Sequence, residues 1–240
     1  MGNKVVLGRV DDVFLAFVVD RLSRVSVLAE AEGARFLCHL RNTGRLPDFI
    51  YEGAPILVQP RPRGRTHALL VGAPVEGGGA ALLDTYMQSR YFEKALSVNA
   101  VSWFSGYSLL KRDVKVMDSR IDYLIRGGRG RRGYMELKSA VYLDHSDGYA
   151  MYPDTVSERG RRHVKLLAKL ARRGGRVIIT FLACHPRAVG FKPCIEGDPI
   201  MPTLLREAGE SGVELRAVRL YVDPSLNVVL DNDDLPIKLD

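Results

Sequence analysis

The chain has 240 residues, is 46% hydrophobic and carries a net charge of +7. This size and apolar content predict a globular protein with one or two buried cores, and the positive charge favours a polyanionic partner, either nucleic acid or an acidic membrane surface. No stretch reaches 18 apolar residues and the N-terminus lacks a signal-peptide core, so neither a transmembrane helix nor a signal peptide is expected. The three cysteines, Cys38, Cys184 and Cys194, show no CxxC spacing. This argues against a disulfide framework or a zinc site and predicts a cytoplasmic protein.

The first 75 residues predict an all-β unit. They are rich in β-branched and aromatic residues, glycines punctuate them, and no helical period intervenes. Strands are expected at 5–10, 13–20, 24–28, 34–40, 56–59 and 67–71. A small closed or half-closed barrel accommodates this many short strands because closure removes exposed sheet edges.

Two loops of this barrel combine arginines and small hydrogen-bonding residues with a glycine that lets a ligand approach the backbone. Such loops suit contacts with nucleic-acid phosphates, although each could also be a solvated turn. The candidate DNA-binding residues of the two loops are Asn42, Thr43, Arg45, Arg61, Arg63 and Arg65.

Residues 74–80, PVEGGGA, have the composition of a linker and place a boundary between domains at 1–76 and 81–240. Asp84, with Gln88 four residues later, predicts the start of a helix that carries Glu93 on one side. A strand is then expected over 107–116.

A β-hairpin is predicted over 119–125 and 134–141, where apolar residues alternate with polar ones. Glu136 and Lys138 project from one face of the second strand, and Leu137 from the other. If the register sets Asp122 opposite Glu136, two carboxylates converge. Such a pair favours a hard divalent cation between its members. The alternative is that Glu136 and Lys138 form an ordinary same-face ion pair.

A helix is predicted over 156–173, capped by Asp154 or Ser157, with an apolar side opposite a basic side. Like charges at helical spacing cost stability, so a negative partner is expected to compensate the basic side. A buried strand at 177–184, a helix at 202–210 and a strand at 213–221 complete the order α-β-β-β-α-β-α-β. The basic side comprises Arg161, Arg162, Lys165, Lys169, Arg172 and Arg173.

The spacing of Asp122, Glu136 and Lys138, Asp-x13-Glu-x-Lys, resembles the core motif of the PD-(D/E)XK nuclease superfamily, and the predicted element order agrees with it independently. The resemblance implies that Asp122 and Glu136 hold Mg²⁺ or Mn²⁺ and that Lys138 positions or deprotonates the attacking water. It also implies that Glu93 reaches the metal through water.

The sequence as a whole resembles the sugar fermentation stimulation protein (SfsA) family. Its motifs are Asn-Thr-Gly-Arg at 42–45, SRIDYL at 119–124, ELKS at 136–139, and YPDTVSERG at 152–160 followed by His163. The resemblance implies an OB-like barrel joined to a nuclease-like domain. It also implies DNA binding of low sequence specificity and a role in regulating sugar utilisation genes.

Three hypotheses follow. The first is a DNA-binding protein that uses the barrel loops, Arg159 and Arg162; duplex is favoured because aromatic residues are not concentrated at predicted loops. The second is an active Mg-dependent DNA endo- or exonuclease, with Glu93 or Glu158 near the metal. The third is a basic module bound to another protein. His163 could contact phosphate or be a satisfied helix histidine. A homodimer is compatible with the sequence.

Overall fold

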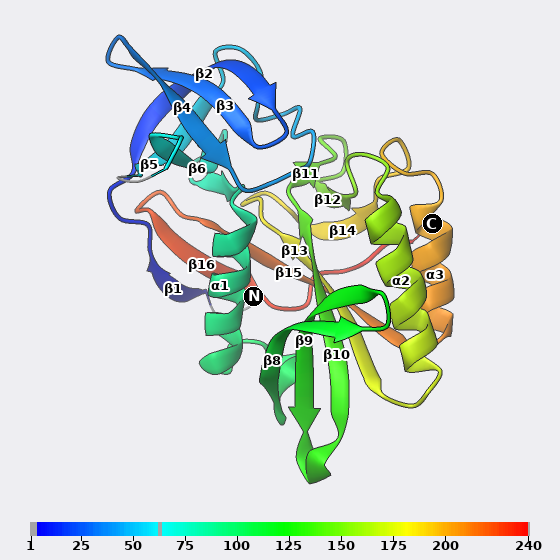
Figure 1. Cartoon of the computed structure of the whole chain (residues 1–240). Coiled ribbons are helices and arrows are strands. Elements are labelled where there is room, and N and C mark those ends of the chain that lie inside the picture. Colours follow the sequence, from blue (N-terminus) through cyan, green and yellow to red (C-terminus); the bar gives the residue numbers. More distant parts are fainter. Residues whose placement is uncertain (1–3, 62–63, 240) are drawn as a thin grey trace.

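The computed structural model describes residues 4–61 and 64–239, and its N-terminal part is the predicted barrel (Figure 1). The strands pair antiparallel in the order β4-β3-β2-β5-β6, and a parallel pairing of β4 with β6 closes the barrel. Small and β-branched side chains, including Ala16, Val18, Val27 and Ile56, fill the interior. The strands are β2 (Phe14–Ser23), β3 (Ser26–Ala31), β4 (Ala34–Leu40), β5 (Pro55–Pro60) and β6 (Ala68–Pro74).

Strand β1 (Val5–Arg9) lies outside the barrel, where the sequence did not place it. It pairs antiparallel with β16 (Asn227–Asn232), a strand that the sequence did not predict, near the other end of the chain. The expectation that residues 5–10 belong to the barrel was wrong because a short apolar strand carries no signal of its partner. β1 instead covers an edge of β16.

The prediction that residues 74–80 form a linker is also wrong. β6 and β7 (Ala80–Leu82) form an antiparallel hairpin, and the Val75 amide donates to the Gly79 carbonyl at 3.1 Å. Gly77, Gly78 and Gly79 all have positive φ, which explains the glycine run: it makes a tight turn possible.

The second part of the chain contains the predicted order of helices and strands. A mixed sheet runs β7-β15-β13-β10-β9-β8, in which β10, β13 and β15 are parallel. Two helices pack on one face of this sheet and one on the other. The elements are α1 (Thr85–Ser97), η1 (Ser102–Phe104), β8 (Tyr107–Val116), β9 (Ser119–Gly127), η2 (Gly128–Gly130), β10 (Arg132–Ala140), α2 (Glu158–Ala171), β13 (Arg176–Ala183), α3 (Met201–Glu210) and β15 (Val213–Val222).

A small second sheet, absent from the sequence prediction, lies between the barrel and α2 (Figure 1). Its strands are β11 (Tyr142–Leu143), β12 (Tyr149–Tyr152) and β14 (Gly190–Pro193). These strands have two to four residues, too few for a period of two to be recognised. Within residues 4–61 and 64–239, no helix is both long and apolar enough to cross a membrane.

Candidate metal centre and nucleic-acid cavity

Asp122 on β9 lies opposite Glu136 on β10, which is the register under which the sequence would bring the two carboxylates together. The backbone ladder between the two strands ends at Tyr123 and Met135, one residue before this pair. Beyond Tyr123 and Met135, side-chain carboxylates replace backbone carbonyls as hydrogen-bond acceptors. The Asp122 amide donates to Glu136 Oε2 at 3.1 Å, and the Leu137 amide donates to Asp122 Oδ2 at 2.7 Å. Each carboxylate therefore accepts a backbone amide at this end of the hairpin.

Glu136 forms the centre of a buried charge cluster. Lys138 Nζ donates to Glu136 Oε1 at 2.8 Å, and His163 Nδ1, from α2, donates to the same oxygen at 2.6 Å. Burial alone raises the pKa of Glu136, but Lys138 and His163 outweigh it and lower the pKa to about 2. For Lys138 burial acts in the other direction and lowers the pKa, because it disfavours the charged ammonium. The Glu136 charge outweighs this effect and raises the pKa of Lys138 above its ordinary value. Glu136 and Lys138 therefore remain an ion pair at neutral pH.

Asp122 is shifted in the opposite direction. Burial, and then the charge of Glu136, raise the pKa of Asp122 to about 6, although the Leu137 amide and the Lys138 charge oppose the shift. No described residue donates a hydrogen bond to Oδ1 of Asp122. Asp122 and Glu136 thus place two carboxylates side by side, and the charge of one disfavours the charge of the other. Oxygen ligands of this kind suit a hard divalent cation. In the part of the chain that the structure describes, no group of three or more His, Cys, Asp or Glu residues is placed to hold a metal.

Asp122, Glu136 and Lys138 line one cavity of about 470 Å³, which we call the carboxylate cavity. Thr43 and Gly44 from the barrel line it together with Leu137 and Ser139 from β10. Further lining comes from the segment around β12 and the start of α2: Tyr152, Pro153, Asp154, Thr155, Ser157, Arg159 and Gly160. The motifs that carry the family resemblance are 109 residues apart in the sequence at Thr43 and Tyr152, yet they meet at this cavity.

Residues 41–46, which we call the roof loop, form the barrel side of the carboxylate cavity and are fastened from several directions. Asp154 Oδ2 accepts the Leu46 amide at 3.0 Å, and a Cβ added to Gly44 would stand 2.6 Å from the same oxygen. The Arg21 guanidinium donates to the carbonyls of Gly44 and Arg45. Thr85, at the start of α1, donates its hydroxyl to the Arg41 carbonyl at 2.6 Å. Glycine is needed at position 44 because Asp154 approaches so closely.

Several predicted DNA-binding residues have other roles. Asn42 is buried: its amide donates to the Leu83 carbonyl and its oxygen accepts the Gly44 amide, so it shapes the roof loop. His163 is 4% exposed and bonded to Glu136, which favours the satisfied helix histidine over a phosphate contact. Both side chains bond within the protein, and Asn42 also lines the carboxylate cavity.

Three of the barrel arginines predicted to bind DNA lie away from the cavity, whereas Arg41 lines it. Arg45, Arg61 and Arg65 are exposed, and none of them lines the carboxylate cavity. Arg63 lies outside the described residues. Of the basic residues predicted on α2, Arg159 lines the cavity, whereas Arg162 is exposed farther along the helix.

The structure also places Glu93 away from the proposed metal centre. Its carboxylate accepts the Tyr123 hydroxyl at 2.8 Å and pairs with Arg112. Tyr123 projects from the face of β9 opposite to Asp122, because successive strand residues alternate. Glu93 does not line the carboxylate cavity, and Glu158 pairs instead with Arg161. The expectation that either carboxylate lies near the metal is therefore corrected.

Sequence reasoning did not select four residues that shape the carboxylate cavity: Arg21, Tyr142, Tyr152 and Asp154. Tyr152 and Asp154 stand in the YPDTVSERG motif, and that motif was the available signal. Arg21 and Tyr142 carried none, because Arg21 reaches the roof loop from β2 and Tyr142 belongs to the unpredicted strand β11.

Comparisons with known proteins cover nearly the whole chain. The family description "SfsA N-terminal OB domain" matches residues 19–80, and "Sugar fermentation stimulation protein RE domain" matches residues 86–226. The sugar fermentation stimulation protein homolog of Pyrococcus furiosus is 36% identical over 93% of this chain and 95% of that protein. The homolog of Chloroflexus aurantiacus is 37% identical over 88% of this chain and 80% of that protein.

A solved structure agrees with the fold described above. Pyrococcus furiosus SfsA in complex with Ca²⁺ superposes with a TM-score of 0.92 at 35% identity, covering 98% of this chain and 99% of that one. The OB-like barrel and the restriction-endonuclease-like α-β-β-β-α-β order are thus both present. The chain belongs to the sugar fermentation stimulation protein family.

Proposed function

We propose that this protein binds DNA with little sequence specificity and acts as a regulator of sugar utilisation genes, with a divalent-metal site at Asp122 and Glu136. The observation that carries the DNA-binding proposal is the convergence of Asp122, Glu136, Lys138, Thr43 and Arg159 on one cavity. Carboxylates that can share a cation with phosphate oxygens, beside an exposed arginine, suit a phosphodiester.

The surface next to the carboxylate cavity supports the same partner. Five exposed cations on α2 and just beyond it form no ion pair with any residue among 4–61 and 64–239. Together with Arg159 they fall within an arc of about 140° on a helical wheel and lead away from the cavity. We call these six residues the α2 stripe: Arg159, Arg162, Lys165, Lys169, Arg172 and Arg173.

Two carboxylates and the Leu137 carbonyl would hold the cation, Mg²⁺ or Mn²⁺, with waters or phosphate oxygens completing its coordination. Mg²⁺ is commonly bound in this way, through one or two carboxylates and substrate phosphates. A bound ion would neutralise charge on phosphate oxygens. The relative crystallised with Ca²⁺ supports a divalent ion in the family.

Binding is tested by titrating labelled DNA with the full-length protein at increasing salt in the presence of Ca²⁺. We expect the logarithm of the association constant to fall linearly with the logarithm of the salt concentration, because each neutralised phosphate releases counterions. Affinity that does not change with salt contradicts the proposal.

The second candidate is metal-dependent hydrolysis of DNA, and Lys138 favours it. Its ammonium is 2.8 Å from Glu136 and lines the cavity, where it can orient a water or stabilise charge on a phosphate. Lys138→Met should abolish cleavage of DNA in Mg²⁺ or Mn²⁺ while salt-dependent binding persists. A wild-type protein that binds DNA but cleaves no form of it in either metal leaves only the binding function.

A further inference from the structure

The carboxylate cavity is the size of a pocket for a single small ligand. Its volume of about 470 Å³ falls within the roughly 300–1,000 Å³ of such pockets. Glu136 is 3% exposed and Lys138 is 8% exposed. A phosphodiester can therefore reach Glu136 and Lys138 only by entering the cavity, and a double helix lying against the surface cannot bring one to them.

The roof loop is bonded to three separate parts of the chain. Arg21 bonds to it from β2 and Asp154 from the segment after β12, while Arg41 is paired with the fully buried carboxylate of Asp84. These bonds connect the roof loop with the barrel, with the start of α1 and with the floor of the cavity. The described contacts therefore hold the roof loop over the cavity.

Ring systems line the same cavity. His39 lies on β4, Tyr142 on β11 and Tyr152 on β12, and each is partly buried. Unpaired bases stack on such side chains without regard to sequence, because every base has a π-face. The sequence favoured duplex because it showed no aromatic cluster in the predicted loops. Tyr142, on the unpredicted strand β11, and Tyr152, on β12, instead line the cavity separately.

We propose that the DNA entering the carboxylate cavity is unpaired: a single strand, or the overhanging or opened end of a duplex. This inference rests on the proposed DNA-binding function. The paired part of a branched or overhanging substrate lies outside, along the α2 stripe. Enzymes that act on nucleotides inside narrow pockets meet the same constraint by taking single strands or by extruding the nucleotide.

The test uses the full-length Tyr142→Trp variant with Ca²⁺ and three DNAs: an oligothymidylate, a dumbbell duplex closed at both ends, and the same duplex with a single-stranded overhang. We expect the oligothymidylate and the overhang to quench the introduced indole by stacking, and the dumbbell to leave its emission unchanged. Wild-type protein should bind the overhang roughly tenfold more tightly than the dumbbell in an anisotropy titration.

Tyr51→Trp is the matched control, because Tyr51 is 55% exposed and does not line the cavity. Its emission should respond to none of the three DNAs. Equal quenching of Tyr142→Trp by the dumbbell, or equal wild-type affinity for dumbbell and overhang, overturns the inference while DNA binding stands. If the wild-type protein binds none of the three DNAs, the proposed function fails together with the inference.

Discussion

Asp122 and Glu136 are close neighbours with opposite electrostatic surroundings. Glu136 holds its charge through Lys138 and His163, whereas burial and the Glu136 charge raise the pKa of Asp122 to about 6. An acid whose pKa is higher in the folded state binds more protons there. It therefore lowers stability as the pH rises from its unfolded value near 4 through 6. Asp122 thus costs stability at neutral pH in the metal-free protein, a cost that a bound cation would relieve.

Asp122→Asn should therefore raise the free energy of unfolding of the metal-free protein at pH 7, by about 1–3 kcal/mol. The amide keeps an oxygen to accept the Leu137 amide but removes the repulsion with Glu136. The same change should abolish the stabilisation that Ca²⁺ gives to the wild type. Urea unfolding with and without Ca²⁺ measures both effects.

Glu93→Gln provides the control for this experiment, because Glu93 bonds to Arg112 and Tyr123 and does not line the carboxylate cavity. Its response to Ca²⁺ should match that of the wild type. A loss of the Ca²⁺ response in Glu93→Gln would mean that the ion binds elsewhere than between Asp122 and Glu136.

The sequence predicted the central residues of the site better than their surroundings. A period of two put Glu136 and Lys138 on one face of their strand, and the resemblance to the nuclease motif implied that Asp122 lies beside them. Asn42 and Glu93 bond to protein groups, and of the two roles considered for His163 its contacts favour the satisfied helix histidine. A sequence motif does not show whether the side chain of one of its residues faces a ligand or bonds to the protein itself. The orientation of the side chain depends on packing between segments that are distant in the sequence.

The cations of helix α2 fall into two groups: Arg161 forms ion pairs within the protein, and the residues of the α2 stripe form none with any described residue. Arg161 forms a two-pronged ion pair with Asp198, with distances of 2.7 to 3.2 Å, and Asp198 also accepts the Ile200 amide beside α3. Asp198 is thus a negative partner of the kind that the sequence required for the basic side of the helix. The cations of the α2 stripe, by contrast, remain available to a ligand.

Asp198→Ala should lower the free energy of unfolding by about 3 kcal/mol, because it leaves Arg161 without its buried partner and the α3 N-terminus without an acceptor. Glu158→Ala removes the other, solvent-exposed partner of Arg161 and should change stability by less than about 0.5 kcal/mol. Urea denaturation of the two variants compares them directly. Equal losses would mean that burial of Asp198 does not set the strength of its pairing.

Lys165→Ala tests the α2 stripe. It should weaken DNA binding and reduce the magnitude of the salt slope by about 1, because one phosphate contact is lost. Lys94→Ala is the matched control: Lys94 is exposed on α1 and does not belong to the stripe. Anisotropy titrations over a range of salt give both slopes. An unchanged slope for Lys165→Ala would remove α2 from the DNA-binding surface.

At the level of elements, the long periodic segments were predicted well. The strand over 107–116 is β8 with the same bounds, and α1, α2 and α3 begin within two residues of their predicted starts. Most of the missed strands are short: β7, β11, β12 and β14 have two to four residues each, and β16 has six. Their pairing partners, not their own composition, make them strands.

The barrel and the nuclease-like sheet share a hydrophobic core, although the sequence suggested two domains joined by a linker. One cluster of buried side chains contains Cys38, Val27 and Ile56 of the barrel together with Ile178 on β13 and Cys184 just after it. The hairpin β6–β7 continues into the pairing of β7 with β15, and β1 pairs with β16. Unfolding the barrel alone would expose apolar surface of the remaining sheet.

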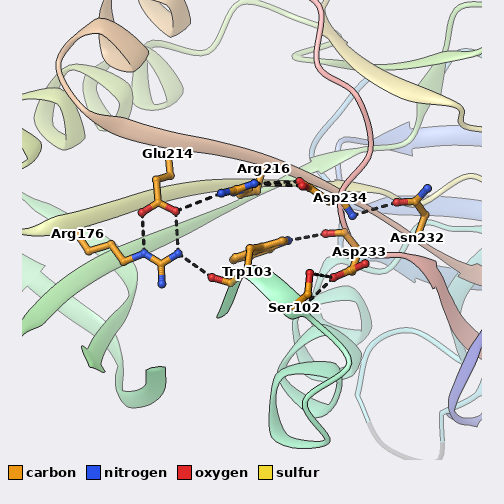
Figure 2. Close-up of polar contacts among 8 residues, drawn as sticks. All are labelled: Ser102, Trp103, Arg176, Glu214, Arg216, Asn232, Asp233 and Asp234. Atoms are coloured by element: carbon orange, nitrogen blue, oxygen red, sulfur yellow. Dashed lines mark hydrogen bonds and ion pairs between the residues drawn. The ribbon is translucent and has the colours of Figure 1, made fainter. Parts of the chain in front are cut away.

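The single tryptophan, Trp103, reports on the mixed sheet at β13 and β15. Its indole donates to the Asp233 carbonyl, while its own carbonyl accepts from Arg176, which forms a two-pronged pair with Glu214 (Figure 2). Figure 2 shows these contacts joining η1 to β13, β15 and the C-terminal segment. Trp103 fluorescence should therefore change when that part of the chain unfolds.

Because of the shared core, we expect both parts of the chain to unfold in one cooperative transition. Cys38 in the barrel and Cys184 after β13 are both fully buried, so each becomes reactive only when its surroundings open. Pulse alkylation along a urea series, read by peptide mass spectrometry, should give the same midpoint for the two thiols. That midpoint should coincide with the loss of native Trp103 fluorescence. Alkylation of Cys38 at clearly lower urea, with Trp103 still native, would show that the barrel opens on its own and that the shared core does not couple the two parts.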